Sequence, residues 1–236
     1  MNKEMIVEKC RKLLKAYESG ELGQTKMPED SHPSFENEEL RLAYFTLPMA
    51  LNYQRDSYKL WESALKTFND SETKIVFDVK KVVNMNKEDL VSLLTKYKLA
   101  LQPNKHISTW QTICKAVSEN FGSFSQLIKQ SDNDFLKLKE LVQDRYKKGF
   151  PYISGPKIFN YWSFIIQEYG KVKLSNSEFI DIAPDTHITK CSVKLGVIDN
   201  LDLSKEQINN RWRELLSDTG ITPIQMHPPL WFWSRC

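Results

Sequence analysis

Closely spaced cysteines are missing from this chain of 236 residues. The four cysteines that it has are scattered and form no Cys-x-x-Cys pair: Cys10, Cys114, Cys191 and Cys236. Zinc and iron–sulfur sites are built on closely spaced thiolates, so we expect no metal centre and no redox cofactor. In a reducing compartment the same scatter predicts four free thiols.

Long hydrophobic runs are missing too. No apolar run approaches the ~18 residues that a membrane-spanning helix needs. The opening sequence, MNKEM, lacks the apolar stretch of a signal peptide. We therefore expect no membrane association and an intracellular location, in the cytoplasm or nucleoid. A large excess of one charge is also absent, because the net charge is only +3. That value permits nucleic-acid binding without arguing for it.

Apolar residues at helical spacing are abundant, and they predict an all-α protein. Capping residues such as Asn86, Asp185 and the pair Ser204 and Gln207 mark helix starts, and glycines mark helix ends. Helices are expected at about residues 3–18, 37–51, 58–65, 86–97, 103–121, 131–149, 158–169, 185–196 and 204–215.

Three local features qualify this pattern. Residues 74–83 are rich in β-branched side chains and are the one candidate for a strand, although a lone strand has no partner here. Pro48 is expected to kink or end the helix at 37–51. Ser131 is expected to cap the helix at 131–149.

The most informative stretch is the hairpin between two helical patterns, 149–157, with the sequence GFPYISGPK. Glycine is expected where the turn needs a positive φ. A turn of this kind presents backbone N–H groups at the start of the second helix, and these can hold a DNA phosphate without reading sequence. Ser154, Gly155 and the basic Lys148 are the candidate DNA contacts. The competing interpretation is a plain helix–helix turn.

Two residues at helix starts are the candidate catalysts. Lys157 lies just inside the second helix, where the helix dipole and burial would both favour its neutral amine. Such an amine can act as a nucleophile and form a Schiff base with a sugar C1′. Asp185 lies at the start of a later helix, where an ionised carboxylate could stabilise oxocarbenium charge and help to deprotonate the lysine. Taken singly, the two also fit a solvated surface lysine and an ordinary N-cap.

Aromatic residues supply a candidate base-binding site. Tyr161 follows Lys157 by four positions, so both lie on one helix face. Trp231 belongs to an aromatic run near the C-terminus. Two such rings can sandwich a nucleobase that has been flipped out of a duplex. Core packing is the competing explanation for any one of these rings.

A polar break between two predicted helices, residues 52–56, is a further candidate. Asn52, Gln54 and Arg55 could fill the space that an extruded base leaves in the duplex. A simple connecting loop fits the same residues equally well.

In this order the motifs resemble those of the helix-hairpin-helix DNA glycosylase superfamily. ISGPK, ending at Lys157, is similar to its hairpin Leu-Pro-Gly-Val-Gly-x-Lys, with Ile153 in place of the first glycine. APDTH, around Asp185, is similar to its Val-Asp-Thr-His motif. The interval of 28 residues (185 − 157) resembles that of the archaeal 8-oxoguanine DNA glycosylases (AGOG). Further similar stretches lie at 40–61, 179–185 and 218–231.

The resemblance implies a fold and an activity. The fold would be all-α and two-lobed, with the active-site cleft between the lobes. Residues 1–65 and 197–236 would form one lobe, and residues 66–196 the helix-hairpin-helix lobe. The activity would be a bifunctional DNA glycosylase and AP lyase that excises 8-oxoguanine from double-stranded DNA, acting as a monomer.

The resemblance also assigns roles to single residues. Lys157 would be the nucleophile and Asp185 the catalytic carboxylate. Tyr161 and Trp231 would stack on the base, and Trp61 would line the same pocket. His227 stands where the family has an aspartate implicated in base recognition, and an imidazole can donate or accept a hydrogen bond.

Three alternatives stay open. His227 motivates a glycosylase for another damaged base. A helix-hairpin-helix module that binds DNA without catalysis would keep its affinity in Lys157→Gln. A helical protein-interaction domain would show no salt-sensitive DNA binding at all.

Overall fold

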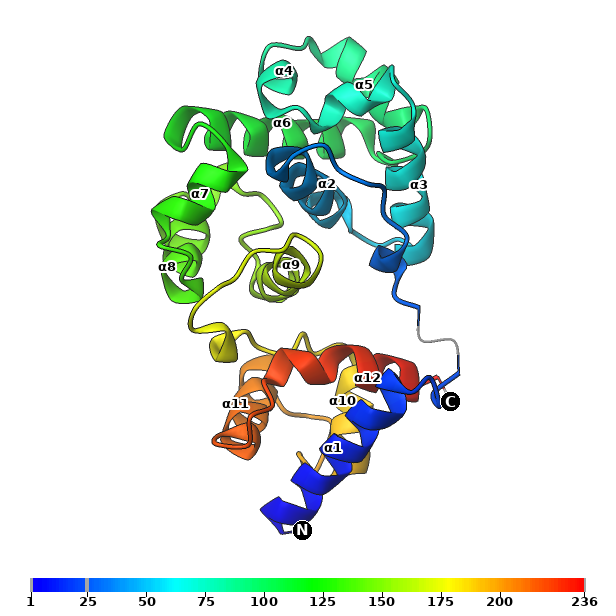
Figure 1. Cartoon of the computed structure of the whole chain (residues 1–236), viewed down its shortest axis with the longest axis vertical. Helices are drawn as coiled ribbons and strands as arrows, with labels where there is room; N and C mark the ends of the chain where they lie inside the picture. The colour runs from blue at the N-terminus through cyan, green and yellow to red at the C-terminus, as the bar shows by residue number, and fades with distance from the viewer. Residues whose placement is uncertain (1, 24–25, 236) are drawn as a thin grey trace. The chain divides into compact units, whose positions relative to one another are not determined.

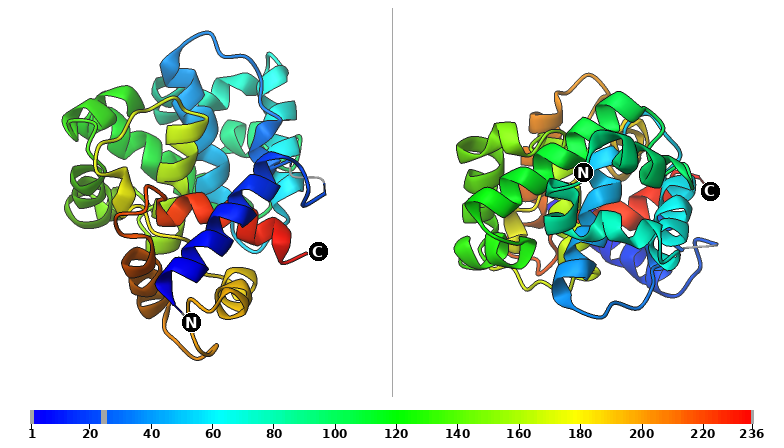
Figure 2. Two further views of the ribbon diagram at one scale, coloured as in Figure 1. Left: turned by 60° about the horizontal axis from the view of Figure 1, so that its bottom comes forward. Right: turned by 90° about the horizontal axis from the view of Figure 1, so that it is seen from above.

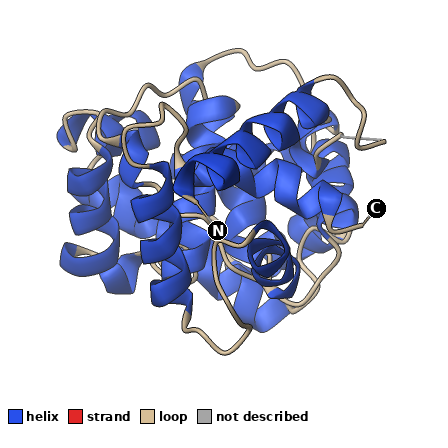
Figure 3. Ribbon diagram, turned by 90° about the horizontal axis from the view of Figure 1, so that it is seen from below, coloured by secondary structure: helices blue, strands red, loops and turns tan. Residues whose placement is uncertain are grey.

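The computed structural model describes residues 2–23 and 26–235, and this part of the chain contains helices and no strand (Figure 3). The all-α prediction is therefore confirmed. By contacts the chain divides into two compact units. We name Pro28–Ser175 the central unit, and Met1–Met27 with Asn176–Cys236 the terminal unit. These boundaries differ from the expected 65/66 and 196/197 because α2 packs against α6 and α9, whereas α10 packs against α12.

The central unit is built around one buried helix, α2 (Figure 1). Every residue of α2 from Leu42 to Leu51 is buried, because α3, α6, α7 and α9 all pack against it. Its elements are η1 Pro28–Asp30, α2 Glu38–Leu51, α3 Ser57–Asn69, η2 Thr73–Phe77, α4 Val79–Val83, α5 Lys87–Thr95, α6 Pro103–Asn120, α7 Phe124–Gln130, α8 Phe135–Lys139, the π-helical η3 Glu140–Arg145, η4 Lys147–Gly149 and α9 Pro156–Glu168.

The terminal unit joins the two ends of the chain. α1 packs along α12, as the left view of Figure 2 shows, and α10 packs against α12 as well. The buried side chains of these helices form one hydrophobic core around Trp212. Its elements are α1 Lys3–Glu18, η5 Ser177–Phe179, α10 Thr186–Leu195, α11 Lys205–Leu216, η6 Pro223–Met226 and α12 His227–Trp233.

Most of the predicted helix ends are confirmed. Asn86 accepts a hydrogen bond from the Asp89 backbone N–H and starts α5. Ser204 and Gln207 form the expected capping box of α11. Each cap provides a partner for a backbone N–H that the first turn of a helix leaves unpaired.

The strand prediction at 74–83 is wrong. This segment forms the short helices η2 and α4, and the Asp78 side chain caps the second by accepting from the Lys81 backbone N–H. Its β-branched residues are largely buried side chains of helices that pack against α3, α5 and α6. A segment without a neighbouring strand satisfies its backbone groups more easily in local helical turns.

Pro48 lies inside α2 and does not end it, since the helix continues to Leu51. The prediction for Ser131 is wrong. Ser131 ends α7 instead of starting a helix, because its hydroxyl donates to the Ile128 carbonyl at 2.6 Å. Asp134 is the cap of the following helix α8.

The thiols Cys10, Cys114 and Cys191 are free and buried, as expected. Burial raises the pKa of Cys10 to about 11 and raises that of Cys191 as well. Cys236 lies outside the described residues. No helix in the described ranges is both long enough and apolar enough to cross a membrane.

Candidate functional site

The hairpin 149–157 is held by its own backbone. The N–H groups of Ile153, Ser154 and Gly155 donate to the carbonyls of Pro151, Phe150 and Tyr152, at 2.9 to 3.0 Å. The two predicted phosphate donors, Ser154 and Gly155, therefore already have partners for their backbone N–H groups.

The expectation that glycine supplies the positive φ of this hairpin is wrong. The left-handed residue is Tyr152, with φ of 65°, whereas Gly155 has φ of −69°. Gly149 is needed for close packing instead, because a Cβ there would lie 2.6 Å from the Cβ of Ala116 in α6. Ile153, which replaces the first glycine of the family hairpin, is fully buried. The positive φ of this hairpin is therefore supplied by a tyrosine, and its glycines have other roles.

Lys157 is the second residue of α9 and is exposed. It makes no hydrogen bond or ion pair through its side chain with the described part of the chain. Its exposure means that burial does not contribute to favouring the neutral amine. The first intrahelical bond of α9 runs from the Phe159 N–H to the Gly155 carbonyl, and no side chain caps this helix. The N–H groups of Lys157 and Ile158 are consequently the ones left for an anion.

One turn further along α9, Tyr161 contacts a residue that the sequence did not single out. The Tyr161 hydroxyl donates to Oε1 of Glu29 at 2.9 Å, and its ring lies 5.9 Å from that of Phe164. Glu29 is only 1% exposed, and its Oε2 has no hydrogen-bond partner among the described residues. Burial raises the pKa of the Glu29 carboxyl to about 7, and Asp30 adds to the rise, whereas the Tyr161 hydroxyl opposes it.

A second unpartnered polar group lies in the helix against which Glu29 packs. η1, which carries Glu29, contacts α3, which carries Trp61. The Trp61 ring is 1% exposed and lies 5.9 Å from Tyr44 and 5.8 Å from Phe45. Its Nε1–H has no hydrogen-bond partner in the described residues. Buried polar groups without partners are rare in folded proteins, and a ligand is one way to complete them.

The polar break at 52–56 is a structured loop rather than a free one. Arg55 donates from Nη1 to the Leu99 carbonyl at 2.6 Å and from Nη2 to the Lys98 carbonyl at 3.1 Å. Its side chain therefore holds the loop onto the segment before α6 and uses one N–H of each Nη to do so. Asn52 is the C-cap of α2, and Gln54 is exposed with φ of 49°.

In the terminal unit, Asp185 is the N-cap of α10, as predicted. Its Oδ1 accepts from the backbone N–H groups of His187 and Ile188, each at 2.9 Å. These two bonds fix the carboxylate at the positive end of the helix. Both end on Oδ1, so Oδ2 is the oxygen that can face another group.

The other candidates of the terminal unit lie in α12. His227 is its first residue and is 7% exposed. Trp231 is half-buried. Its ring centroid lies 5.0 Å from that of Phe232, with the two rings nearly perpendicular, and the Arg235 guanidinium lies 3.5 Å from the centroid of the Trp231 ring. One face of the Trp231 ring is therefore covered by a cation, and a base could stack there only if Arg235 moved.

The candidates form two groups within the two units. Lys157, Tyr161 and Trp61 belong to the central unit together with Glu29, whereas the terminal unit holds Asp185, His227 and Trp231. Glu29 is the residue that sequence reasoning missed, since a glutamate in a turn-rich segment carries no sign that it will be buried.

No group of three or more His, Cys, Asp or Glu residues within the described ranges is arranged to hold a metal ion. No protein-family model matches the sequence, and no curated protein is significantly similar to it.

Proposed function

We propose that this chain is a bifunctional DNA glycosylase and AP lyase that removes a damaged base, with 8-oxoguanine expected, from duplex DNA. The observation that carries the proposal is the position of Lys157. Its exposed amine, with no salt-bridge partner in the described residues, lies in the uncapped first turn of α9 directly after a tight hairpin. Free N–H groups at that helix start suit a phosphate, and the amine suits the sugar beside it.

The proposed reaction begins with the neutral amine of Lys157 attacking C1′ of the damaged nucleotide. The N-glycosidic bond breaks, and the base leaves with the bonding electrons and takes up a proton. The sugar ring opens as O4′ is protonated, which leaves an iminium ion between Lys157 and C1′. Loss of a C2′ proton then expels the 3′ phosphate by β-elimination and nicks the strand.

Asp185 would supply the negative charge in this reaction. A carboxylate whose Oδ1 is fixed by two cap bonds presents Oδ2 with little reorganisation. In that position it would stabilise positive charge on the sugar and take the proton from Lys157. The two-lobed helix-hairpin-helix arrangement is part of this proposal, since both residues must act on one nucleotide.

Base recognition would rest on Tyr161 and on two unpartnered polar groups of the same unit, at Glu29 and Trp61. A protonated Glu29 offers an O–H donor at Oε2, and Trp61 offers its indole N–H. His227 would add a group that donates or accepts. A carboxyl and an imidazole at these positions also favour the second candidate, a glycosylase for a different damaged base.

Borohydride trapping on a labelled 8-oxoguanine duplex tests the proposal. Native protein should form a covalent complex with the DNA, Lys157→Gln should form none, and Lys139→Gln, an exposed lysine in α8, should trap like native protein. Trapping by Lys157→Gln would remove that residue as the nucleophile. If native protein neither traps nor releases base from a panel of lesion duplexes, the enzyme proposal fails.

The same preparations separate the non-enzymatic alternatives. Salt-sensitive binding with no base release would favour a DNA-binding module, and the affinity of Lys157→Gln would then stay close to native. Absence of salt-sensitive binding would favour a helical protein-interaction domain.

A further inference from the structure

An exposed cluster of two tyrosines and one lysine lies beside the hairpin in the central unit. The ring centroids of Tyr53 and Tyr152 are 5.6 Å apart and tilted by 50°. The Lys105 ammonium lies 4.2 Å from the Tyr53 centroid and 5.0 Å from the Tyr152 centroid. These residues come from the loop after α2, the first turn of α6 and the hairpin.

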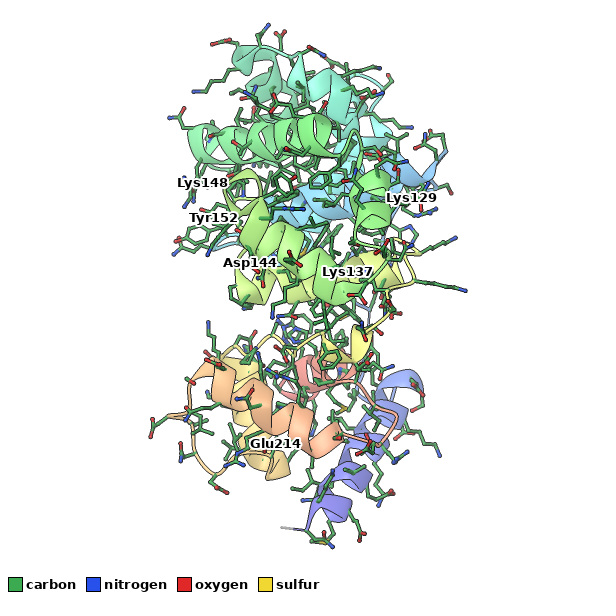
Figure 4. All side chains as sticks on the ribbon, turned by 90° about the vertical axis from the view of Figure 1, so that its left-hand side faces the viewer. Lys129, Lys137, Asp144, Lys148, Tyr152 and Glu214 are labelled. Carbon is green, nitrogen blue, oxygen red and sulfur yellow. The ribbon has the colours of Figure 1, made fainter. Side chains whose placement is uncertain are left out.

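This cluster is accessible from solvent. Tyr53 is 38% exposed, Lys105 is exposed and Tyr152 is half-buried. Figure 4 shows the side chains of Tyr152 and Lys148 directed outward. Lys148 is exposed and lies four residues before Tyr152 in the sequence, so it adds a second positive charge to this segment.

Each segment that carries the cluster is fixed by its own hydrogen bonds. Arg55 ties the loop of Tyr53 to the carbonyls of Leu99 and Lys98. The start of α6 is held by the Leu101 N–H, which donates to Nδ1 of His106 at 3.1 Å. Tyr152 lies in the self-bonded hairpin. A surface site held in this way loses little conformational entropy when it binds.

The chemistry of the cluster matches an unstacked nucleobase with its phosphate. The Lys105 ammonium lies over the Tyr53 ring, so a base could stack on that face only if Lys105 moved, and the ammonium would then neutralise the phosphate beside the base. Tyr53 also lies in the loop that the sequence predicted to touch DNA, where Arg55 has proved to be engaged elsewhere. Tyr53 and Gln54 are both exposed in that loop, and Tyr53 is the aromatic one.

We propose that Tyr53, Lys105 and Tyr152 form a platform that binds an unpaired nucleobase in DNA, on the evidence of the ring geometry, the cation close to both rings and the exposure of Tyr53 and Lys105. The platform rests on the proposed function only in taking DNA as the partner. It needs neither Lys157 nor a damaged base, and it predicts a preference for duplexes that contain an unpaired nucleotide.

Fluorescence anisotropy on two undamaged duplexes tests the platform. One duplex is fully paired, and the other is identical except for a single extra, unpaired nucleotide. Tyr53→Leu should weaken binding to the bulged duplex roughly tenfold more than binding to the paired one, since a base–aromatic stack is lost. Tyr53→Phe keeps the ring and should bind both duplexes as native protein does.

Two lysine substitutions in α6 test whether the charge of Lys105 contributes to DNA binding. Lys105→Gln should lower the salt dependence of binding by about one released counterion. Lys115→Gln, which lies in the same helix α6 and pairs with Glu119 at 3.8 Å, should leave it unchanged. Thermal unfolding of every variant checks that the fold is retained.

Two outcomes would overturn the platform: equal losses on both duplexes in Tyr53→Leu, or a loss in Tyr53→Phe as large as that in Tyr53→Leu. Borohydride trapping with native protein reports separately on the enzyme. If native protein is trapped and Tyr53→Leu weakens binding to both duplexes equally, the platform proposal fails and the enzyme proposal stands. If Tyr53→Leu weakens binding mainly to the bulged duplex and native protein is not trapped, the platform is supported and the enzyme proposal fails.

Discussion

Glu29 should make the stability of this protein fall as the pH rises. Its carboxyl is buried, and its pKa is raised from the ordinary 4.5 to about 7. Between these values the folded protein holds a proton that the unfolded chain releases, so the free energy of unfolding decreases with pH. The contribution of Glu29 is fully present below the unfolded pKa of 4.5 and is lost as pH rises through the folded pKa of about 7.

The size of this loss follows from the two pKa values. From about pH 5 to about pH 8, linkage predicts that the free energy of unfolding falls by about 2.5 kcal/mol through Glu29 alone. Glu29→Gln keeps an acceptor for the Tyr161 hydroxyl but cannot ionise. Relative to this variant, native protein should therefore lose about 2.5 kcal/mol over the same range.

Urea unfolding of both proteins at about pH 5 and about pH 8 measures the difference directly, because titrating groups common to both cancel. Glu140→Gln, an exposed glutamate in η3, is the control and should track native protein at both pH values. If the gap between native protein and Glu29→Gln is the same at the two pH values, Glu29 does not titrate as a buried carboxyl.

Three other substitutions follow from single contacts. Asp185→Asn keeps an N-cap side chain and should abolish excision while DNA affinity stays within about twofold of native; excision at the native rate would refute the catalytic role. Trp231→Ala should weaken binding to a lesion duplex more than binding to undamaged DNA, and equal losses would count against base stacking. Gly149→Ala should lower the free energy of unfolding by about 1–3 kcal/mol through its clash with Ala116. Adding Ala116→Gly should restore part of that loss in urea unfolding, and no recovery would show that the clash is not the cause.

The helices of this protein were predictable wherever the deciding interaction is local. Asn86, Asp185 and the Ser204–Gln207 pair each bond a backbone N–H within three residues, so their caps can be read from neighbouring letters alone. The strand prediction for residues 74–83 fails because the deciding interaction is not local. Their β-branched side chains favour a strand by composition, but no second strand is available, and burial between helices decides the outcome.

The candidate site was predictable only in part. Lys157 is just inside the start of α9 and Tyr161 follows one turn later, because both positions depend on the hairpin and on helical spacing. Glu29 could not be found in this way. It meets Tyr161 across 132 residues of sequence, and its burial depends on helices that the segment around it does not specify.

Three residues of the central unit depart from local rules. Tyr152 takes a left-handed conformation that usually costs a non-glycine residue about 1–3 kcal/mol. Glu29 is a buried carboxyl, and its Oε2 has no hydrogen-bond partner among the described residues. The buried indole N–H of Trp61 has no partner among them either. Natural sequences tend to break such rules at functional sites, where the strained or unpaired group is retained for what it binds. If packing alone explained these three residues, Tyr152→Gly, Glu29→Gln and Trp61→Phe would each stabilise the protein without loss of DNA affinity or excision. The proposed function predicts instead that Glu29→Gln and Trp61→Phe each gain stability and lose binding or excision, and the platform predicts that Tyr152→Gly gains stability and loses affinity for a bulged duplex.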